Sequence, residues 1–331
     1  MKISILSDGG WGTALAMLLT GNGHDVTLWG PFPDYIEQMR REHENTRFLK
    51  GVKLPPGLRL ESDLEAAMQA EYLILASPTQ YMRGVLKQMK PFLKPDRHKL
   101  IDVAKGIECE TLMRVSDMCR EILGECRYSV MSGPSHAEEV SREIPTAVVA
   151  ASADAELAQE VQQLFMNQYF RVYTSDDYVG VELGGALKNV MAIAAGIIDG
   201  MRLGDNPKAA MMTRGIAEMS RLGAALGGSP MTFAGLSGIG DLIVTCCSGH
   251  SRNRYVGEQL GRGLKIDEIT RSMGMVVAEG VKTARSAWQL AQNHNVEAPI
   301  IEQVHSVIYE GHDPRQAIIE LMGRKAKSEM E

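Results

Sequence analysis

Short apolar stretches alternate with helical patterns over the first half of the chain. Lys2–Leu6 is an apolar run, Thr13–Leu19 predicts a buried helix that glycines close, and β-branched residues in His24–Trp29 predict a second strand. Further strands are predicted at Tyr72–Ala76, Lys99–Ala104, Arg127–Met131, Thr146–Ala151 and Phe170–Thr174. This alternation predicts a mainly parallel, doubly wound sheet with helices on both faces.

A glycine-rich loop follows the first predicted strand. Ser7-x-Gly9-x-x-Gly12 has the spacing of a dinucleotide-binding fingerprint, with serine at its first position. In that fingerprint the first small residue allows a tight turn, the second lets the backbone approach a pyrophosphate, and the third lets helix and strand pack closely. The free N–H groups of the helix that follows can receive the diphosphate. A glycine turn without a ligand is the alternative.

The second half of the chain has a helical pattern without predicted strands. After about Asp176 no further strand is predicted, and long helical segments are rich in Ala, Gly, Leu and Met. We therefore predict an α/β fold, with an N-terminal Rossmann-type doubly wound domain over residues 1–178 and a C-terminal all-α substrate and catalytic domain over residues 179–331. The second strand ends in Leu28-Trp29-Gly30-Pro31, which offers neither an acid for the ribose of NAD nor an arginine for the phosphate of NADP.

Composition narrows the class of protein. The length of 331 residues suits about two domains, and 44% hydrophobic with 23% charged residues is typical of a soluble globular protein. A net charge of −6 argues against nucleic-acid binding. The apolar runs fall short of the ~20 residues that span a bilayer, and no signal peptide is recognisable. Five cysteines without a C-x-x-C spacing and eight scattered histidines predict free thiols, a cytoplasmic location and no metal site.

Polar residues interrupt the most apolar predicted helix, Tyr178–Gly200. It carries Glu182, Lys188 and Asn189, although it is apolar nearly all round and should be buried. A buried lysine is costly unless it is paired or used, and burial lowers the pKa of such an amine from about 10.4. Lys188 is therefore a candidate general acid and base. A lysine that reaches the surface, or a structural ion pair, is the alternative.

Other candidates lie in loops. Asp241 ends a glycine-dense loop and could orient a lysine or a substrate hydroxyl, or simply cap a helix. Lys105 and Ser135 follow predicted strands, where the ligand crevice of an open α/β sheet lies. The segment Ser251-Arg252-Asn253 could bind a phosphate, or be a solvated polar turn. His136 could be a base, although a lone histidine at a helix start is more often structural.

Together these stretches resemble the bacterial NAD(P)-dependent glycerol-3-phosphate dehydrogenases, in whose order they occur. The matching segments are Gly9–Ala16, Lys105-Gly106, Ser132–Ser135, Leu187–Val190, Thr213–Gly215, Gly238–Leu242, Ser251–Arg254 and Ala278–Val281. The resemblance implies reversible hydride transfer between NAD(H) or NADP(H) and a triose phosphate. Dihydroxyacetone phosphate would become sn-glycerol 3-phosphate, a precursor of membrane phospholipids.

The resemblance also implies roles for individual residues. Lys188 would give a proton to the nascent alkoxide and take it back in the reverse direction. Substrate contacts would come from Lys105, Gly133, Ser135, Lys188, Asp241, Ser251, Arg252 and Asn253. Cofactor contacts would come from Gly9, Gly10, Trp11, Gly12, Lys105, Ala137, Arg252, Val277 and Glu279. We expect a homodimer; apolar stretches such as Gln289–Ala291 and Pro299–Ile308 could form its interface or equally a core.

The chain departs from the family's pattern in three places. Ser7 replaces the first fingerprint glycine, and Asp8 adds a negative charge near the expected pyrophosphate, so cofactor affinity is in question but not the position of the site. His136 stands where many relatives carry phenylalanine and is interpreted as lining the pocket.

Two alternative functions remain. A β-hydroxyacid or 6-phosphogluconate type dehydrogenase is the enzymatic alternative, and a non-catalytic nicotinamide sensor is the alternative from another class.

Overall fold

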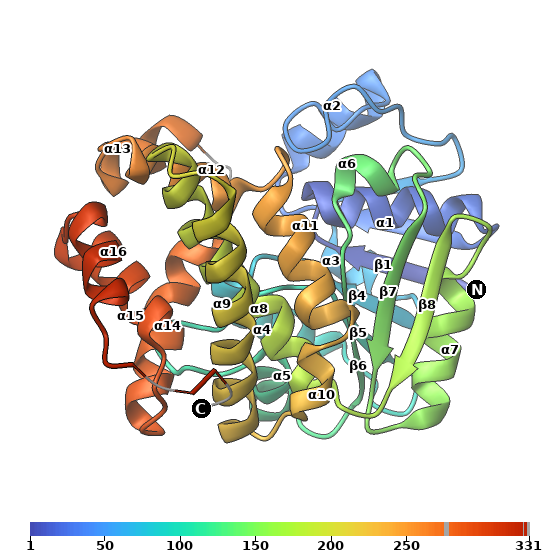
Figure 1. The fold of residues 1–331 in the computed structure, drawn as a ribbon. Helices are drawn as coiled ribbons and strands as arrows, with labels where there is room; N and C mark the ends of the chain where they lie inside the picture. Colours follow the sequence, from blue (N-terminus) through green and yellow to red (C-terminus); the bar gives the residue numbers. More distant parts are fainter. Residues whose placement is uncertain (275–277, 327, 330–331) are drawn as a thin grey trace.

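The computed structural model describes residues 1–274, 278–326 and 328–329. Within them the strands form one sheet in the order β3-β2-β1-β4-β5-β6-β7-β8, with neighbours parallel except for β6 and β7 (Figure 1). The strands are β1 (Lys2–Leu6), β2 (Asp25–Trp29), β3 (Arg59–Glu61), β4 (Tyr72–Leu75), β5 (Lys99–Asp102), β6 (Arg127–Ser132), β7 (Thr146–Ala151) and β8 (Phe170–Ser175). The predicted doubly wound, mainly parallel sheet is thus confirmed.

The predicted strands are all present, with ends that agree within two residues. The sequence does not predict β3, because this edge strand has three residues, Arg59–Glu61, and none of them is buried. Such a short polar segment carries neither the apolar run nor the alternation that predicts a strand. The miss does not affect the site, which lies on the other side of β1.

Helices cover both faces of the sheet because its inner strands are apolar on both sides. Tyr72 and Ile74 of β4 belong to one buried cluster, and Leu73 and Leu75 to another. Successive residues of a strand point to opposite faces, so each face needs its own helical cover. The helices of this half are α1 (Gly10–Gly21), α2 (Pro33–Glu42), α3 (Leu64–Ala67), α4 (Thr79–Met89), η1 (Lys90–Phe92), α5 (Val115–Leu123), α6 (Ala137–Val140) and α7 (Ala155–Phe165).

The second half is helical and is built around one central helix, α8 (Tyr178–Gly200). Its neighbours approach closely at glycines: a Cβ on Gly257 would lie 2.0 Å from the Ile193 carbonyl oxygen, so no larger residue fits there. The other elements are α9 (Asp205–Ala225), α10 (Pro230–Phe233), η2 (Leu236–Gly240), α11 (Asp241–Cys247), α12 (Arg252–Gly261), α13 (Ile266–Met273), α14 (Glu279–Asn293), α15 (Pro299–His305), η3 (Ser306–Glu310) and α16 (Pro314–Met322). The Rossmann-type sheet followed by a helical half confirms the predicted fold class.

Two segments of the described chain are long and apolar enough to be considered as membrane spans. The first is α8, whose apolar window is entirely buried inside the protein, as expected for the core helix of a folded domain. The second, Pro230–Cys247, includes Asp241, whose carboxylate is buried between two lysines. Pro299–Ile308 is also mostly buried, with Ile300, Ile301 and Val304 in the helical core. Of the two interpretations of that stretch, the structure favours the core.

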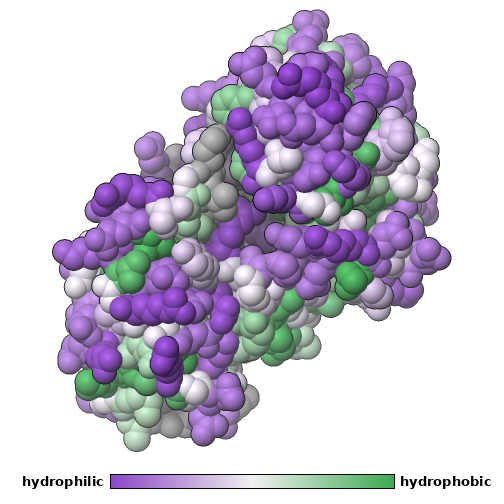
Figure 2. All heavy atoms as spheres, turned by 90° about the horizontal axis from the view of Figure 1, so that it is seen from above, coloured by the Kyte–Doolittle hydropathy of each residue, from purple (hydrophilic) through white to green (hydrophobic). Residues whose placement is uncertain are grey.

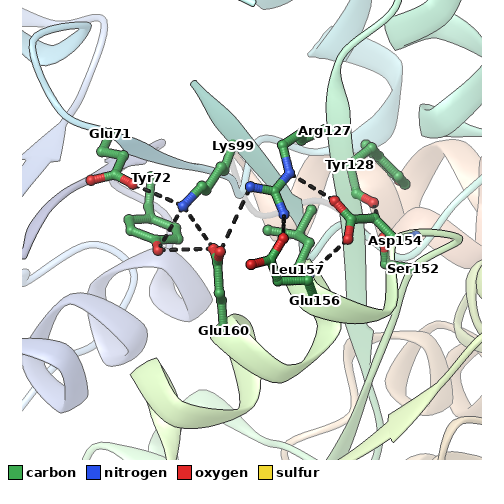
Figure 3. A network of polar contacts seen from close by, with 10 residues as sticks. All are labelled: Glu71, Tyr72, Lys99, Arg127, Tyr128, Ser152, Asp154, Glu156, Leu157 and Glu160. Atoms are coloured by element: carbon green, nitrogen blue, oxygen red, sulfur yellow. Dashed lines mark hydrogen bonds and ion pairs between the residues drawn. The ribbon is translucent and has the colours of Figure 1, made fainter. Parts of the chain in front are cut away.

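The amino ends of the central strands are held by a network of ion pairs (Figure 3). Lys99, the first residue of β5, pairs with Glu71 and with Glu160 of α7, each at 2.8 Å. Arg127, the first residue of β6, pairs with Asp154 at 2.7 Å. This network joins α7 to the amino ends of the strands, whereas Lys105 and Ser135 follow their carboxyl ends.

Candidate active site

The carboxyl ends of β5 and β6 meet the helical half along α8 and α11. Gly185 of α8 lies against the end of β6, since a Cβ there would be 2.7 Å from Ser132 Oγ. The loops after these strands bring Lys105 and Ser135 to the same place. Figure 2, a view from above, shows a hollow between the two lobes of the molecule, with hydrophilic residues on its floor.

A buried carboxylate joins the two candidate lysines. Asp241 Oδ2 lies 2.7 Å from Lys105 Nζ, and Asp241 Oδ1 lies 2.9 Å from Lys188 Nζ. The three side chains are 2%, 15% and 7% exposed in that order. Gly240, not Asp241, is at the cap position of α11, so the carboxylate is used for the lysines and not for capping. Two of the named candidates thus meet across the border between the halves, with Asp241 as the link.

The ion pairs set the protonation states in this cluster. Burial alone would raise the pKa of the Asp241 carboxyl, but Lys105 and Lys188 outweigh burial and hold that pKa below its usual value. Burial lowers the pKa of Lys105 to about 8, with Lys188 adding to the effect and Asp241 opposing it. The cluster therefore combines a stable carboxylate with an amine that titrates only slightly above neutral pH.

Hydroxyl and carbonyl groups complete the surroundings of the lysines. Lys105 Nζ donates to the Gly133 carbonyl oxygen at 2.9 Å and lies 3.4 Å from Ser135 Oγ. Lys188 Nζ lies 2.6 Å from Thr245 Oγ1, a residue that is not among the candidates named from the sequence. Its position four residues after Asp241 was the available signal, because that spacing puts both side chains on one face of a helix.

His136 lies near the same cluster. Its pKa is lowered by burial and by the nearby charges of Lys188 and Lys105, so the ring is neutral at pH 7. Its Nε2 atom is buried and has no partner among the described residues, and its ring lies 5.9 Å from that of His250. His136 thus lies beside the lysine cluster, and its interpretation as a pocket-lining residue stays a prediction.

Two asparagines tie the site to the helical half. Asn189 Nδ2 donates to the Lys105 carbonyl oxygen at 2.8 Å, and Asn253 Nδ2 donates to Asn189 Oδ1 at 2.8 Å. Gly280 N donates to Asn253 Oδ1 at 2.9 Å. The Asn253 amide is therefore partly engaged in joining α8, α12 and α14. The two other residues of its segment differ: Ser251 caps α12 by accepting from Arg254 N at 3.2 Å, and Arg252 is exposed at the first position of that helix.

Glu279 connects the first residue of α14 to the sheet domain. Its Oε1 accepts from Thr79 N, the first residue of α4, at 2.8 Å. Burial raises the pKa of this carboxyl, while the Thr79 contacts, Arg252 and Lys188 act in the opposite direction. The charges of Arg252, Glu279 and Lys188 are thus within electrostatic reach of one another. Val277 lies outside the described residues.

The glycine loop has the geometry that a dinucleotide requires. A Cβ on Gly12 would lie 2.3 Å from the Ser7 carbonyl oxygen, so only glycine permits this close approach of helix and strand. At Gly9 a Cβ would meet nothing closer than Ser7 Oγ at 3.6 Å, which leaves room for a ligand. No side chain caps α1, and Trp11 Nε1 is buried without a partner among the described residues. These features fit the diphosphate of a nicotinamide cofactor.

The two unusual residues of this loop behave differently from one another. Asp8 is 5% exposed and turns toward the end of β2, where a Cβ on Gly30 would lie 2.6 Å from its Oδ2. Burial raises the pKa of this carboxyl, while a backbone hydrogen bond and the charge of Arg47 act in the opposite direction. Ser7 has φ 150°, a conformation that favours glycine.

Because Ser7 occupies a glycine-like conformation, we expect Ser7→Gly to stabilise the protein. Relief of backbone strain, about 1–3 kcal/mol, should exceed the entropic cost of glycine, about 0.5–1 kcal/mol. Thermal melting and titration with NADH would measure stability and cofactor affinity. Ser141→Gly is the matched control, since Ser141 has φ −65° and glycine there should only destabilise. A lower melting temperature for Ser7→Gly would contradict the strain at Ser7.

A second buried polar cluster joins the two halves beside the site. Glu182 of α8 bonds Arg114 at 2.8 Å and Ser116 Oγ at 2.7 Å. Tyr128 Oη lies 2.9 Å from Glu182 and 3.0 Å from Asp102 at the end of β5. The polar residues of α8 therefore face different partners: Glu182 anchors the helix to the sheet, and Lys188 reaches the crevice.

In the described part of the chain no three His, Cys, Asp or Glu side chains are grouped so as to hold a metal ion. The donors gathered here are two ammonium groups, hydroxyls and backbone amides, which suit anions and polar oxygens. A site that binds an anionic substrate beside a dinucleotide is what this arrangement offers.

Comparisons with known proteins agree with this arrangement. Residues 2–158 match the sequence model for the N-terminus of NAD-dependent glycerol-3-phosphate dehydrogenase, and residues 177–319 match the model for its C-terminus. A glycerol-3-phosphate dehydrogenase [NAD(P)+] of Geobacter metallireducens is 53% identical, over 99% of this chain and 98% of that protein. The corresponding protein of Bacillus licheniformis is 51% identical, over 100% of this chain and 96% of that protein. The crystal structure of glycerol-3-phosphate dehydrogenase from Coxiella burnetii superposes with a TM-score of 0.94, at 38% identity, over 98% of this chain and 99% of that one.

Proposed function

The chain belongs to the NAD-dependent glycerol-3-phosphate dehydrogenase family, and from this premise we propose that its nicotinamide cofactor and its triose phosphate substrate meet in the crevice between the two halves. The enzyme is an NAD(P)-dependent oxidoreductase that interconverts dihydroxyacetone phosphate and sn-glycerol 3-phosphate. The observation that carries the proposal for the site is the buried Lys105–Asp241–Lys188 cluster between the strand ends and α8.

Lys188 is the proposed proton donor. When bound, the nicotinamide supplies a hydride to C2 of the ketone or accepts it in reverse. The oxygen on C2 then develops negative charge, and a fixed ammonium group beside it stabilises that charge and can transfer a proton. The Lys188 amine is positioned by Asp241 and Thr245, at 2.9 and 2.6 Å. Burial of Asp241 keeps water away from this contact and strengthens it.

The remaining substrate contacts follow from the same placement. Lys105 is positioned by Gly133 and Asp241 to bind an oxygen of the substrate, with Ser135 beside it. Arg252, exposed at the start of α12, is proposed to bind the phosphate together with Ser251 and Asn253. A phosphate held away from the reacting carbon lets binding energy orient the carbonyl group.

The proposed cofactor contacts come mainly from the glycine loop and the first residue of α6. The N–H groups of Gly10, Trp11 and Gly12 at the start of α1 would hold the diphosphate, with Gly9 giving it room. Ala137, the first residue of α6, packs against Gly10, since a Cβ there would lie 3.9 Å from Ala137 Cβ. Lys105, Arg252 and Glu279 are proposed to contact cofactor and substrate where the two ligands adjoin. Val277 belongs to the same proposal from the family resemblance alone.

A substrate and cofactor panel tests the proposed function. Purified protein would be mixed with NADH or NADPH and either dihydroxyacetone phosphate or a 3-oxoacid, and separately with NAD+ or NADP+ and either a β-hydroxyacid or 6-phosphogluconate, and followed by nicotinamide absorbance. We expect turnover of dihydroxyacetone phosphate at least 100-fold above that of the others. A carboxylate substrate that is turned over faster would favour a hydroxyacid dehydrogenase. Cofactor binding without turnover of any substrate would favour a sensor.

We expect Arg252→Ala to raise the KM for dihydroxyacetone phosphate far more than the KM for the nicotinamide cofactor. Loss of a charged hydrogen bond to phosphate costs about 1.5–3 kcal/mol, or roughly 10- to 150-fold in KM. Initial rates with each ligand varied in turn measure both constants. The matched control is Arg142→Ala, an exposed arginine of the sheet domain whose side chain donates to a main-chain carbonyl. Equal increases in both constants would remove Arg252 from the phosphate site.

The pH profile of kcat/KM should report Lys105. Because burial lowers the pKa of Lys105 to about 8, the amine loses its proton as pH rises through 8. Its charge then no longer binds the substrate oxygen, so we expect kcat/KM for dihydroxyacetone phosphate to fall above pH 8. The pH dependence of kcat/KM reports pKa values of the free enzyme, so a fall near pH 8 corresponds to Lys105 before substrate binds. Lys105→Met should lower kcat/KM and abolish this limb; a limb that persists in the variant would belong to another group.

Three further features belong to this proposal. We propose that the domains divide between residues 178 and 179, because β8 ends at Ser175, α8 begins at Tyr178, and each half has its own buried core.

We propose a homodimer, supported by exposed apolar side chains such as Met231, Ile239 and Ile243 on the α10–α11 segment. Light scattering coupled to size exclusion tests it. A cytoplasmic location is also proposed, where the free thiols of the five cysteines are stable.

A further inference from the structure

A cavity separate from the proposed site lies in the helical half, among α8, α9, α15 and α16. It has a volume of about 370 Å³ and is lined mainly by apolar side chains, among them Ile197, Met211, Val304 and Leu321. Well-packed protein interiors have few voids larger than a water molecule. A cavity of this volume falls within the range of about 300–1,000 Å³ found for small-molecule sites. The apolar lining points to a hydrocarbon ligand.

Cationic side chains gather at the rim of this cavity. Arg214, Arg221, Arg324 and Lys325 all contribute to its lining. Arg214 donates to the Glu329 carbonyl oxygen at 2.8 Å, and Arg221 donates to the Glu297 carbonyl oxygen at 3.0 Å. Carbonyl oxygens are neutral acceptors, so these two contacts position the guanidinium groups without cancelling their charge.

The acidic groups near the rim do not balance the cations. Glu297 forms an ion pair with Arg324. Glu218 is 2% exposed and accepts from Ile300 N and Ile301 N at the start of α15. Burial raises the pKa of Glu218 to about 7, so its negative charge is only partly present at neutral pH. Among the side chains that line the cavity, four are cationic and one, Glu218, is acidic, so the lining carries a net positive charge.

We propose that this cavity binds an anionic amphiphile, with a single acyl chain in the apolar interior and a carboxylate or phosphate head at Arg214 and Arg221. Each buried CH₂ group of such a chain contributes about 0.8 kcal/mol, and each guanidinium can hold a carboxylate or phosphate through paired hydrogen bonds. Met322, which is 82% exposed beside the opening, offers a flexible apolar surface over which a chain can enter.

A second copy of the chain is a poorer occupant. A symmetric dimer built on this face would bring two copies of the same cationic patch into one interface. Like charges brought together in this way repel, whereas an anionic head neutralises them. The charge pattern therefore favours a small anionic ligand over self-association at this face.

Calorimetric titration of the full-length protein tests the proposal. The probes are dodecanoate and dodecyl phosphate, with dodecyltrimethylammonium and butanoate as controls for head charge and chain length, all below their micellar concentrations. We expect one equivalent of each anionic probe to bind, and at least tenfold weaker binding of both controls. Dodecanoate and dodecyl phosphate distinguish a free carboxylate from a phosphate head as the preferred ligand.

Two variants locate the binding. Ala317, buried on α16 and lining the cavity, would be changed to phenylalanine to fill the space, and Arg214→Gln would weaken the head contact. We expect each to weaken anionic probe binding at least tenfold, whereas Arg142→Gln, on the sheet domain, should not. Turnover of dihydroxyacetone phosphate reports that each variant is folded. No binding to the wild type, equal binding of cationic and anionic probes, or a dimer that dissociates on Ala317→Phe would overturn the proposal.

Discussion

Lys188→Ala should lower kcat for dihydroxyacetone phosphate reduction by at least ~100-fold, and up to ~10,000-fold, the range expected for loss of a general acid. The Lys188 side chain is 7% exposed and its amine lies 2.9 Å from Asp241 Oδ1, so the amine is held in one place before the substrate arrives. Without it the developing negative charge on the C2 oxygen has no fixed ammonium group beside it. The KM should change less than kcat, because the phosphate contacts stay intact.

Two further variants separate chemistry from folding. Lys188→Met keeps the apolar stem and should lose as much activity as the alanine variant. The space left by Lys188→Ala could admit a small primary amine, so added ethylamine should partly restore turnover in that variant but not in Lys188→Met. Lys99→Met is the matched control: Lys99 is also paired with carboxylates, two in this case, but at the amino end of β5 (Figure 3). It should lower the melting temperature and leave kcat unchanged. A Lys188→Ala enzyme with near wild-type turnover would remove Lys188 from the chemistry.

The strands and the glycine loop were predictable because local physical rules fix them. A strand buried on both faces must be an apolar run, and Tyr72–Leu75 is one. Gly12 must lack a Cβ because the Ser7 carbonyl oxygen lies too close. A contact of this kind requires glycine at a fixed distance along the chain, and that spacing can be recognised in the sequence. The edge strand β3 has no buried residue, so no apolar run in the sequence indicates it.

The partners of the buried polar residues could not be predicted, because they come from distant parts of the chain. Lys188 was recognisable as unusual from its own helix, but Asp241 lies 53 residues further along the chain and Lys105 lies 83 residues before it. The same holds for Glu182, whose partners Arg114 and Tyr128 belong to the sheet domain. Sequence patterns identify a polar side chain that needs a partner; only the fold decides which one it has.

The unusual residues of the glycine loop illustrate the same limit. The sequence indicates that Asp8 brings a charge to the diphosphate position. In the structure the carboxyl group turns to Gly30 and is buried, which raises its pKa. Only a residue as small as glycine at the end of β2 leaves space for it. The Asp8 side chain thus occupies the space that a side chain at position 30 would need.

Asp241→Asn should be the most damaging single change to the site after loss of Lys188. Asparagine has nearly the same shape as aspartate but no charge, so Lys105 and Lys188 would face each other in a buried place without the carboxylate that now separates them. Removal of one partner from a buried ion pair costs about 3–5 kcal/mol. We expect a loss of stability of that size and a fall in kcat of at least ~100-fold, because Lys188 loses the group that positions it.

The pH dependence of this loss distinguishes charge repulsion from simple misfolding. In the variant the folded-state pKa of Lys105 should fall further below its unfolded value, so the unfolded chain binds more protons and stability rises with pH. The stability deficit relative to wild type should therefore be larger at pH 7 than at pH 10, as measured by denaturant unfolding at each pH. Asp199→Asn is the matched control, since Asp199 also pairs with two cations, Lys208 and Arg254, but is 21% exposed. Water screens that pair, so a loss of stability below about 1 kcal/mol is expected in Asp199→Asn. If both variants lost the same stability at every pH, Asp241 would not be preventing repulsion between the buried lysines.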